Sequence, residues 1–236
     1  MNLCEALRLR PREVVVFVGG SGKTTAMVRL AGERASAGQR VITTTTTHLG
    51  ADQTAFAPMH VISPPADIAT IRSALHTHLH VLVTGPLDLA LGKATSVPEN
   101  LIKQWCTLPE MAAVLVEADG ARQPPLKAPA DHEPAIPAFA THVVIVVGLE
   151  VLGQPLTEAV AHRPERIAAL AGLPIGPIIT PDALVCVRLH PQGGLKNIPA
   201  RALVSILLKR RKTLRLLTWL EPSQSSCSKT PPSSPF

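Results

Sequence analysis

Short apolar runs that do not alternate with polar residues constrain the fold of this chain most. EVVVFV at 13–18 and THVVIVVG at 141–148 are the clearest, and similar runs lie at 40–47, 80–85, 112–120 and 202–208. A strand with one solvated face alternates, whereas a parallel strand covered by helices on both faces is apolar along its length. The runs therefore predict buried strands of a mostly parallel sheet.

Helical patterns separate several of these runs. We expect helices over 23–37, 66–79 and 181–189, the last with Thr180 as its cap and Pro181 at its first position. Strands that alternate with helices form βαβ units, so the expected fold class is α/β, with a parallel sheet flanked by helices. Aromatic residues make up 3% of the 236 residues, so Val, Ile, Leu and Ala must fill the core.

The positive charge is confined to one end of the chain. Residues 1–195 hold 15 Lys or Arg against 16 Asp or Glu, whereas residues 196–236 hold 8 against Glu221 alone. We therefore divide the chain into a folded domain at 1–208 and a basic, then Ser/Pro-rich tail at 209–236, disordered after about Glu221. No aromatic residues interleave with the charges, so no nucleic-acid partner is expected.

Cysteine spacing and hydropathy exclude several other classes. The cysteines are scattered without a CxxC pair, which predicts neither a zinc site nor a disulfide framework. No apolar run approaches the roughly 20 residues that span a bilayer, and no signal-peptide core follows the first ten residues. We expect a cytoplasmic protein with no membrane partner.

The segment VVVFVGGSGKTT at 14–25 carries the strongest functional signal. A strand that enters a glycine loop followed by Lys-Thr at a helix start is the context of a phosphate-binding P-loop, in which backbone N–H groups and the lysine hold the phosphates. The threonine hydroxyl completes a Mg²⁺ shell. The fold is thus expected to be P-loop NTPase-like, with ATP or GTP as ligand. The predicted nucleotide-binding residues here are Gly19, Gly20, Ser21, Gly22, Lys23, Thr24 and Thr25.

The loop departs from the common pattern GxxxxGK[ST] at its first position, which is Phe17. Partition-type ATPases carry KGGxGKT, but Val18 replaces their signature lysine, so a lysine that reaches into a partner subunit is not supported. The alternative is a glycine turn with an incidental lysine. We favour phosphate binding because strand, loop and helix are in register.

Two carboxylates follow the strand in AAVLVEADGA. Glu117 and Asp119 leave the same face in alternating geometry, and both are predicted to serve Mg²⁺ together with Thr24. The alternative is a carboxylate pair on a solvated loop. Five threonines at 43–47 precede His48, and at a strand end their hydroxyls suit phosphate or metal-bound water, although threonine is also simply a good strand former. His48 and Asp119 are the candidates to position an attacking water, and Lys23 the candidate catalytic cation.

These motifs, with EADGARQPPLKAPADHEPAIP, VVGLEVLGQPL, AHRPERIAAL and HPQGGLKNIP, resemble the YqeC-type selenium cofactor biosynthesis proteins over about 10–208. The resemblance implies a nucleotide-binding accessory protein that acts in maturation of a selenium-dependent molybdenum hydroxylase. Its partners would be that enzyme or its cofactor-inserting proteins. It also implies a set of site-lining residues: Thr45 to His48, Lys127, His132, Glu133, Arg163 and Glu165.

Each of these has a structural alternative. Lys127 and His132 lie in a proline-rich loop where charges are commonly solvated, and Arg163 could clamp a phosphate or pair with a glutamate at a helix start. As ligand residues, Lys127, His132 and Arg163 would suit an acceptor pocket. The rival functions are therefore a small-molecule kinase or nucleotidyl transferase, and a non-catalytic nucleotide-binding partner protein.

The end of the chain departs from the resemblance. The resemblance implies that an Asn-Lys-x-Asp or Asn-Gln-like stretch, which could read a guanine edge, follows ALVSILL, but Leu208 runs into Lys-Arg-Arg-Lys. We hypothesise that residues after about 208 are not the ancestral tail and that base specificity is impaired or lost. A shifted reading frame or a truncated gene would produce such a change, and natural divergence is the alternative. The sequence therefore leaves ATP and GTP both open.

Overall fold

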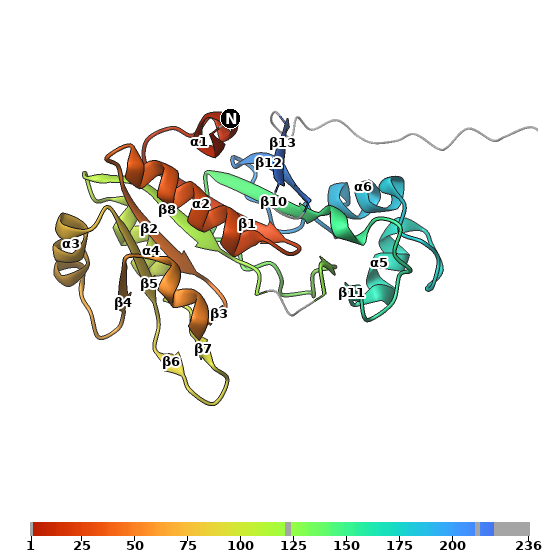
Figure 1. Cartoon of the computed structure of the whole chain (residues 1–236), viewed down its shortest axis with the longest axis horizontal. Helices are drawn as coiled ribbons and strands as arrows, with labels where there is room; N and C mark the ends of the chain where they lie inside the picture. The colour runs from red at the N-terminus through yellow and green to blue at the C-terminus, as the bar shows by residue number, and fades with distance from the viewer. Residues whose placement is uncertain (1, 121–123, 211–212, 220–236) are drawn as a thin grey trace, which may run out of the picture.

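The computed structural model of the chain describes residues 2–120, 124–210 and 213–219. Its centre is an eight-stranded sheet with the order β13-β12-β10-β1-β8-β2-β5-β4 (Figure 1). All neighbouring pairs are parallel except β12 and β13, which are antiparallel. The strands are β1 (Glu13–Gly19), β2 (Arg40–Thr45), β4 (Met59–Ile62), β5 (His80–Thr84), β8 (Met111–Glu117), β10 (His142–Gly148), β12 (Leu203–Arg210) and β13 (Thr213–Trp219).

This architecture confirms the predicted α/β class with a mostly parallel sheet flanked by helices. All six predicted strands are present, and only their ends differ: β2 stops at Thr45 rather than at 47. Strand β4 was not predicted, because its four residues MHVI are too short and too mixed to stand out from a loop.

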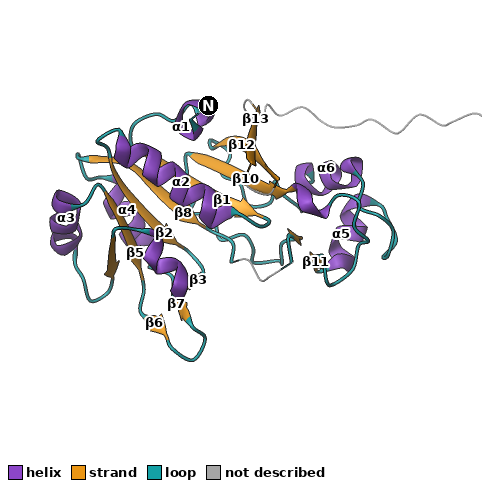
Figure 2. Ribbon diagram, in the orientation of Figure 1, coloured by secondary structure: helices purple, strands orange, loops and turns teal. Residues whose placement is uncertain are grey.

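Helices cover both faces of the sheet, as the apolar runs require (Figure 2). Val15 and Phe17 of β1 pack with α1 (Leu3–Leu7) and α2 (Lys23–Ser36) on one face. Val14, Val16 and Val18 belong to the larger core on the other face, with α3 (Ile68–Thr77) and α4 (Glu99–Cys106). Burial on both sides explains why β1 has no polar alternation.

A small lobe lies past the carboxyl end of β10 (Figure 1). It contains η2 (Leu149–Val151), α5 (Pro164–Ala171), α6 (Pro181–Leu189) and the two-stranded parallel pair β9 (Leu126–Lys127) and β11 (Ala161–His162). Helix α6 has the predicted bounds, and the Thr180 Oγ1 accepts a hydrogen bond from the Ala183 N–H at 3.2 Å, as expected of its cap. The lobe is thus placed at the edge of the sheet where strand ends gather.

A second, smaller extension follows β2 and β5. It consists of η1 (Ala51–Phe56) and a three-stranded sheet of β3 (Leu49–Gly50), β6 (Leu87–Asp88) and β7 (Lys93–Ala94).

The sheet continues past the boundary predicted at 208, because β12 runs to Arg210 and β13 pairs with it. The tail from 220 to 236, expected to be disordered, lies outside the described residues. Cys4, Cys106 and Cys186 are free thiols, and Cys227 lies outside the described part. No helix within the described residues is both long and apolar enough to cross a membrane.

Candidate functional site

The glycine loop joins the carboxyl end of β1 to the first turn of α2. Gly19 and Gly22 have φ angles of 102° and 99°, which residues with a side chain rarely adopt. A Cβ on Gly19 would also lie 2.5 Å from the Val146 carbonyl oxygen. Gly22 is the N-cap of this 14-residue helix, and no side chain hydrogen-bonds the N-terminal amides of α2 as a cap. Those amides and the helix dipole favour an anion there.

Lys23 lies beneath this loop and is 2% exposed. Its Nζ donates hydrogen bonds to the Gly19 and Gly20 carbonyl oxygens, at 3.1 and 3.2 Å. Burial lowers the pKa of the Lys23 ammonium, while the Glu117 and Asp119 carboxylates act in the opposite direction. The predicted phosphate-binding cation is therefore held inside the loop.

Thr24, in the first turn of α2, contacts Glu117 at the carboxyl end of β8. The Thr24 Oγ1 donates a hydrogen bond to the Glu117 Oε2 at 2.7 Å, across 93 positions of sequence. Glu117 is 4% exposed, and burial raises its pKa against the effects of Lys23 and the Thr24 hydroxyl. A hydroxyl and a carboxylate in contact beside a lysine form the donor set that suits Mg²⁺ with a phosphate.

Asp119 also points into this region, but its partner is Lys127. The Lys127 Nζ contacts the Asp119 Oδ1 in a buried ion pair and lies 3.0 Å from the Glu133 Oε1. The Arg163 Nη1 in turn contacts the Glu133 Oε2 at 2.8 Å. These ion pairs form a row of alternating charges, Asp119–Lys127–Glu133–Arg163, which links the end of β8 to the small lobe. Lys127 and Arg163 therefore already have carboxylate partners within the protein.

Glu133 is strongly acidic in this network. Burial opposes its ionisation, but the hydrogen bond from the Ala130 N–H and the cations Lys127 and Arg163 outweigh burial and lower its pKa to about 2. Two predicted ligand residues thus hold an ionised carboxylate. Arg163 does pair with a glutamate, but this is Glu133 of the proline-rich loop and not a glutamate at a helix start.

Only part of the threonine run at 43–47 lies next to the site. The Thr45 Oγ1 donates to the Glu117 carbonyl oxygen at 2.9 Å, whereas Thr43 bonds the buried His80 ring at 2.9 Å and Thr46 bonds the Ala135 carbonyl oxygen. The bonds of Thr43 and Thr45 hold β2 against β5 and β8, and the bond of Thr46 joins the segment after β2 to the proline-rich loop. Thr44 is fully buried, and its hydroxyl has no hydrogen-bond partner within the described residues.

Several predicted residues lie at the surface. His48, His132, Thr25 and Glu165 are exposed. Within the part of the chain that the structure describes, no hydrogen bond or ion pair joins His48 or His132 to the glycine loop. The residues that the structure describes contain no group of three or more His, Cys, Asp or Glu that could hold a metal ion. A metal at this site would therefore depend on Thr24 and phosphate oxygens as well as on carboxylates.

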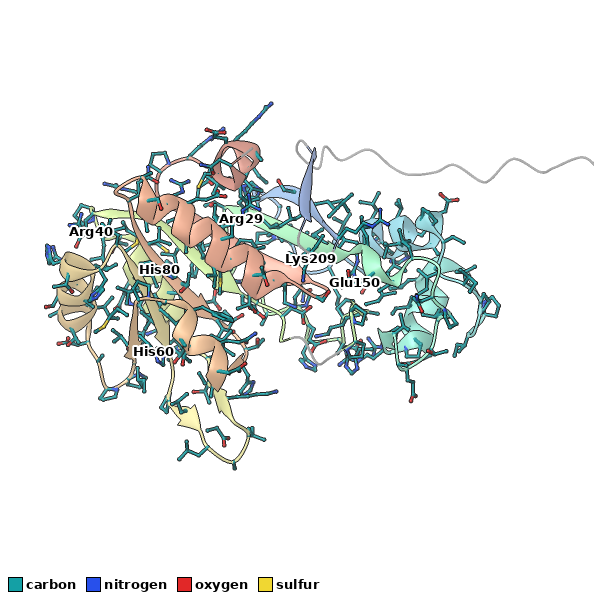
Figure 3. All side chains as sticks on the ribbon, viewed as in Figure 1. Arg29, Arg40, His60, His80, Glu150 and Lys209 are labelled. Carbon is teal, nitrogen blue, oxygen red and sulfur yellow. The ribbon has the colours of Figure 1, made fainter. Side chains whose placement is uncertain are left out.

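Sequence reasoning missed three residues at the loop. The Ser21 hydroxyl hydrogen-bonds the Glu150 carboxylate of η2. A Cβ on Gly22 would lie 2.9 Å from the Lys209 Nζ, so this lysine lies against the loop, and Figure 3 shows Glu150 and Lys209 at this end of the sheet. Lys209 was assigned to a solvated tail by composition. Lys209 directly follows a predicted parallel strand, and this position could have indicated that it lies at the same sheet edge as the glycine loop.

The third missed residue is Arg188 of α6, which is 4% exposed. Its Nη1 donates to the Lys127 carbonyl oxygen at 3.4 Å, and its guanidinium lies beside Gly20. Burial lowers its pKa to about 10, so it stays protonated at neutral pH. Arg188 follows a helical pattern in which a cation in the last turn is ordinary, and this masked it.

Comparisons with known proteins place the chain in a family. The family model described as "YqeC protein" matches residues 15–165. A protein of Escherichia coli (strain K12), named "Uncharacterized protein YqeC", is 34% identical over 199 residues, which cover 79% of this chain and 71% of the relative. No solved structure matches the chain. The matched region contains the glycine loop, both strand-end carboxylates and the Lys127–Glu133–Arg163 network, and the chain therefore belongs to the YqeC family.

Proposed function

We propose that this protein binds a nucleoside triphosphate with Mg²⁺ at the glycine loop and hydrolyses it. The observation that carries the proposal is the Thr24–Glu117 hydrogen bond of 2.7 Å beside the buried Lys23, at the uncapped start of α2. A P-loop requires these three groups at this junction: a lysine for the phosphates, a hydroxyl for the metal and a carboxylate from a neighbouring strand.

The residues would divide the work by position. The first amides of α2 and the Lys23 ammonium would neutralise the phosphates, and Thr24 and Glu117 would hold Mg²⁺, with Asp119 nearby. Bound Mg²⁺ supplies charge neutralisation at the phosphate oxygens. A water that attacks the terminal phosphorus breaks its bond to the bridging oxygen and releases inorganic phosphate and the diphosphate. The chain's contribution to this step is positioning and electrostatics.

In the cell, we propose an accessory role in maturation of a selenium-dependent molybdenum hydroxylase. Membership of the YqeC family supports an accessory role, and the sequence resemblance supports the selenium context. The proposed partners are the hydroxylase or the proteins that insert its cofactor. Loss of the protein should lower that enzyme's activity without lowering its abundance.

Phosphate release from ATP and GTP tests the catalytic part. We expect Mg²⁺-dependent release by the wild type and a loss of at least about 100-fold in Lys23→Ala and Glu117→Gln, because each removes a group that neutralises transition-state charge. Lys103→Ala on α4 is the control, since Lys103 is exposed and remote. Tight binding without turnover, unchanged by Glu117→Gln, would instead favour a non-catalytic nucleotide-binding protein. A phosphorylated or nucleotidylated cofactor precursor would favour a transferase.

A further inference from the structure

Arg188 is a buried cation whose hydrogen-bonding capacity is mostly unused. It is 4% exposed, yet its Nε and Nη2 atoms have no hydrogen-bond partner among the residues that the structure describes. The one hydrogen bond that its side chain makes within the described part of the chain, from Nη1 to the Lys127 carbonyl oxygen, is long at 3.4 Å. Buried guanidinium donors are normally paired. This side chain therefore has two donors available for a group that is absent here.

The guanidinium faces the glycine loop. A Cβ built on Gly20 would lie 3.5 Å from the Arg188 Nη2. Arg188 also lines a small cavity together with Gly19 of the loop and Asp119 of the strand end. The side chain thus reaches from the small lobe to the space between the carboxyl ends of β1 and β8.

The glycine pair of HPQGGLKNIP fixes this position. The Gly194 N–H donates to the Val187 carbonyl oxygen at 3.0 Å, and a Cβ on Gly194 would lie 2.9 Å from the Arg188 Cα. Only a residue without a side chain allows the turn to close this tightly on α6. The packing holds Arg188 in place before any ligand binds.

The charges around the cavity favour an anion. Asp119 is the one carboxylate among the described residues that line it, and Lys127 already pairs with Asp119. The Asp119 carboxylate also acts on Arg188, but no ion pair joins Arg188 to a carboxylate within the described residues. Two cations, Lys127 and Arg188, thus line the cavity with one carboxylate. A guanidinium with two available donors is suited to an oxyanion such as phosphate.

We propose that Arg188 binds the terminal phosphate of the nucleoside triphosphate, supplied by α6 of the same chain. The inference rests on the proposed nucleotide binding at the glycine loop. The start of α2 and Lys23 would serve the phosphates nearer the helix, whereas the cavity that Arg188 lines is bordered by Gly19 and Asp119 at the strand ends and not by Thr24 or Glu117. A terminal phosphate is the part of the ligand that reaches this space, and a diphosphate lacks it.

Comparison of triphosphate and diphosphate affinity tests the proposal. We would titrate ATP and ADP, and GTP and GDP in parallel, with Mg²⁺ against the full chain by calorimetry. Arg188→Ala should weaken triphosphate binding about 10- to 100-fold, the value of one charge-assisted hydrogen bond or more, and change diphosphate binding by less than about threefold. Arg72→Ala is the control: Arg72 lies on α3, pairs with Glu110 at the surface and should alter neither affinity.

Arg188→Lys keeps the positive charge but removes the planar guanidinium with its paired N–H donors, so it provides the test if the alanine variant does not fold. It should also weaken the triphosphate selectively. Equal losses for both nucleotides, or an unchanged triphosphate affinity in a folded Arg188 variant, would overturn the proposal while leaving nucleotide binding intact. A wild type that binds neither nucleotide would overturn the proposed function and this inference together.

Discussion

The hydrogen bond between Thr24 and Glu117 gives a quantitative test of the site without any ligand. Thr24→Val keeps the shape and the β-branch but removes the donor to a carboxylate that is 4% exposed. A hydrogen bond to a charged group contributes about 1.5–3 kcal/mol, so the free energy of unfolding should fall by about that amount. For a chain of this size, the corresponding decrease in Tm is about 3–12 °C. Thr24→Ser keeps the hydroxyl and is the control.

The loss should depend on pH in a defined direction. Burial raises the pKa of Glu117, and the Thr24 hydroxyl opposes that rise by favouring the ionised form. The hydroxyl's contribution is therefore complete above the folded pKa of Glu117 and decreases as the pH falls through it. The difference in unfolding free energy between the Val and Ser variants should be larger at pH 8 than at pH 4.5.

Guanidinium unfolding of the two variants, alone and combined with Glu117→Gln, measures this. In the Gln background only a neutral hydrogen bond remains, worth about 0.5–1.5 kcal/mol, so the cost of Thr24→Val should shrink. Equal stability of the Val and Ser variants, or a cost that is the same in both backgrounds and at both pH values, would refute the reasoning.

Two further predictions concern the framework of the site. Gly19→Ala should destabilise the fold by about 1–3 kcal/mol, because Gly19 has a φ of 102° and a Cβ there would collide with Val146. Gly32→Ala inside α2 should instead stabilise the fold by about 0.5–1 kcal/mol, because a Cβ there meets nothing within 4 Å. Thermal melts in which both variants shift Tm in the same direction would contradict this. Burial lowers the pKa of His80 to about 4, so the stability that depends on the neutral ring is complete above pH 6.5 and is lost as the pH falls towards 4. Between pH 6.5 and 4, the free energy of unfolding of His80→Gln should therefore fall by up to about 3 kcal/mol less than that of the wild type, as measured by guanidinium unfolding. Identical pH profiles of the two proteins would refute this prediction.

The parts of the site that follow local sequence rules could be predicted. Strand, glycine loop and helix at 13–36 are encoded within one short segment, and the apolar runs show that the sheet is covered on both faces. The contact of Thr24 with Glu117 followed because the carboxyl ends of parallel strands meet at one edge. The sequence pattern alone thus located the loop, its lysine and one carboxylate.

The remaining contacts depend on how distant segments pack. Asp119 pairs with Lys127, which the proline-rich loop that leads to the lobe brings in, and its place beside a metal stays a prediction. Arg188 and Lys209 reach the loop only because α6 and β12 end at this edge of the sheet. No periodicity or spacing in the sequence reports such tertiary contacts, so a buried arginine in α6 is indistinguishable from an ordinary cation of a last helical turn.

The most direct test of the central claim is nucleotide binding to the glycine loop. Fluorescent ATP and GTP analogues would be titrated with Mg²⁺ against the wild type, Lys23→Ala and the surface control Lys103→Ala. We expect saturable binding by the wild type and the control, and a loss of at least about 100-fold in Lys23→Ala, since Lys23 is the buried cation of the loop. The ratio of ATP to GTP affinity would show whether the chain reads the base. A folded wild type that binds neither analogue, or a Lys23→Ala variant that binds as tightly as the wild type, would contradict the account.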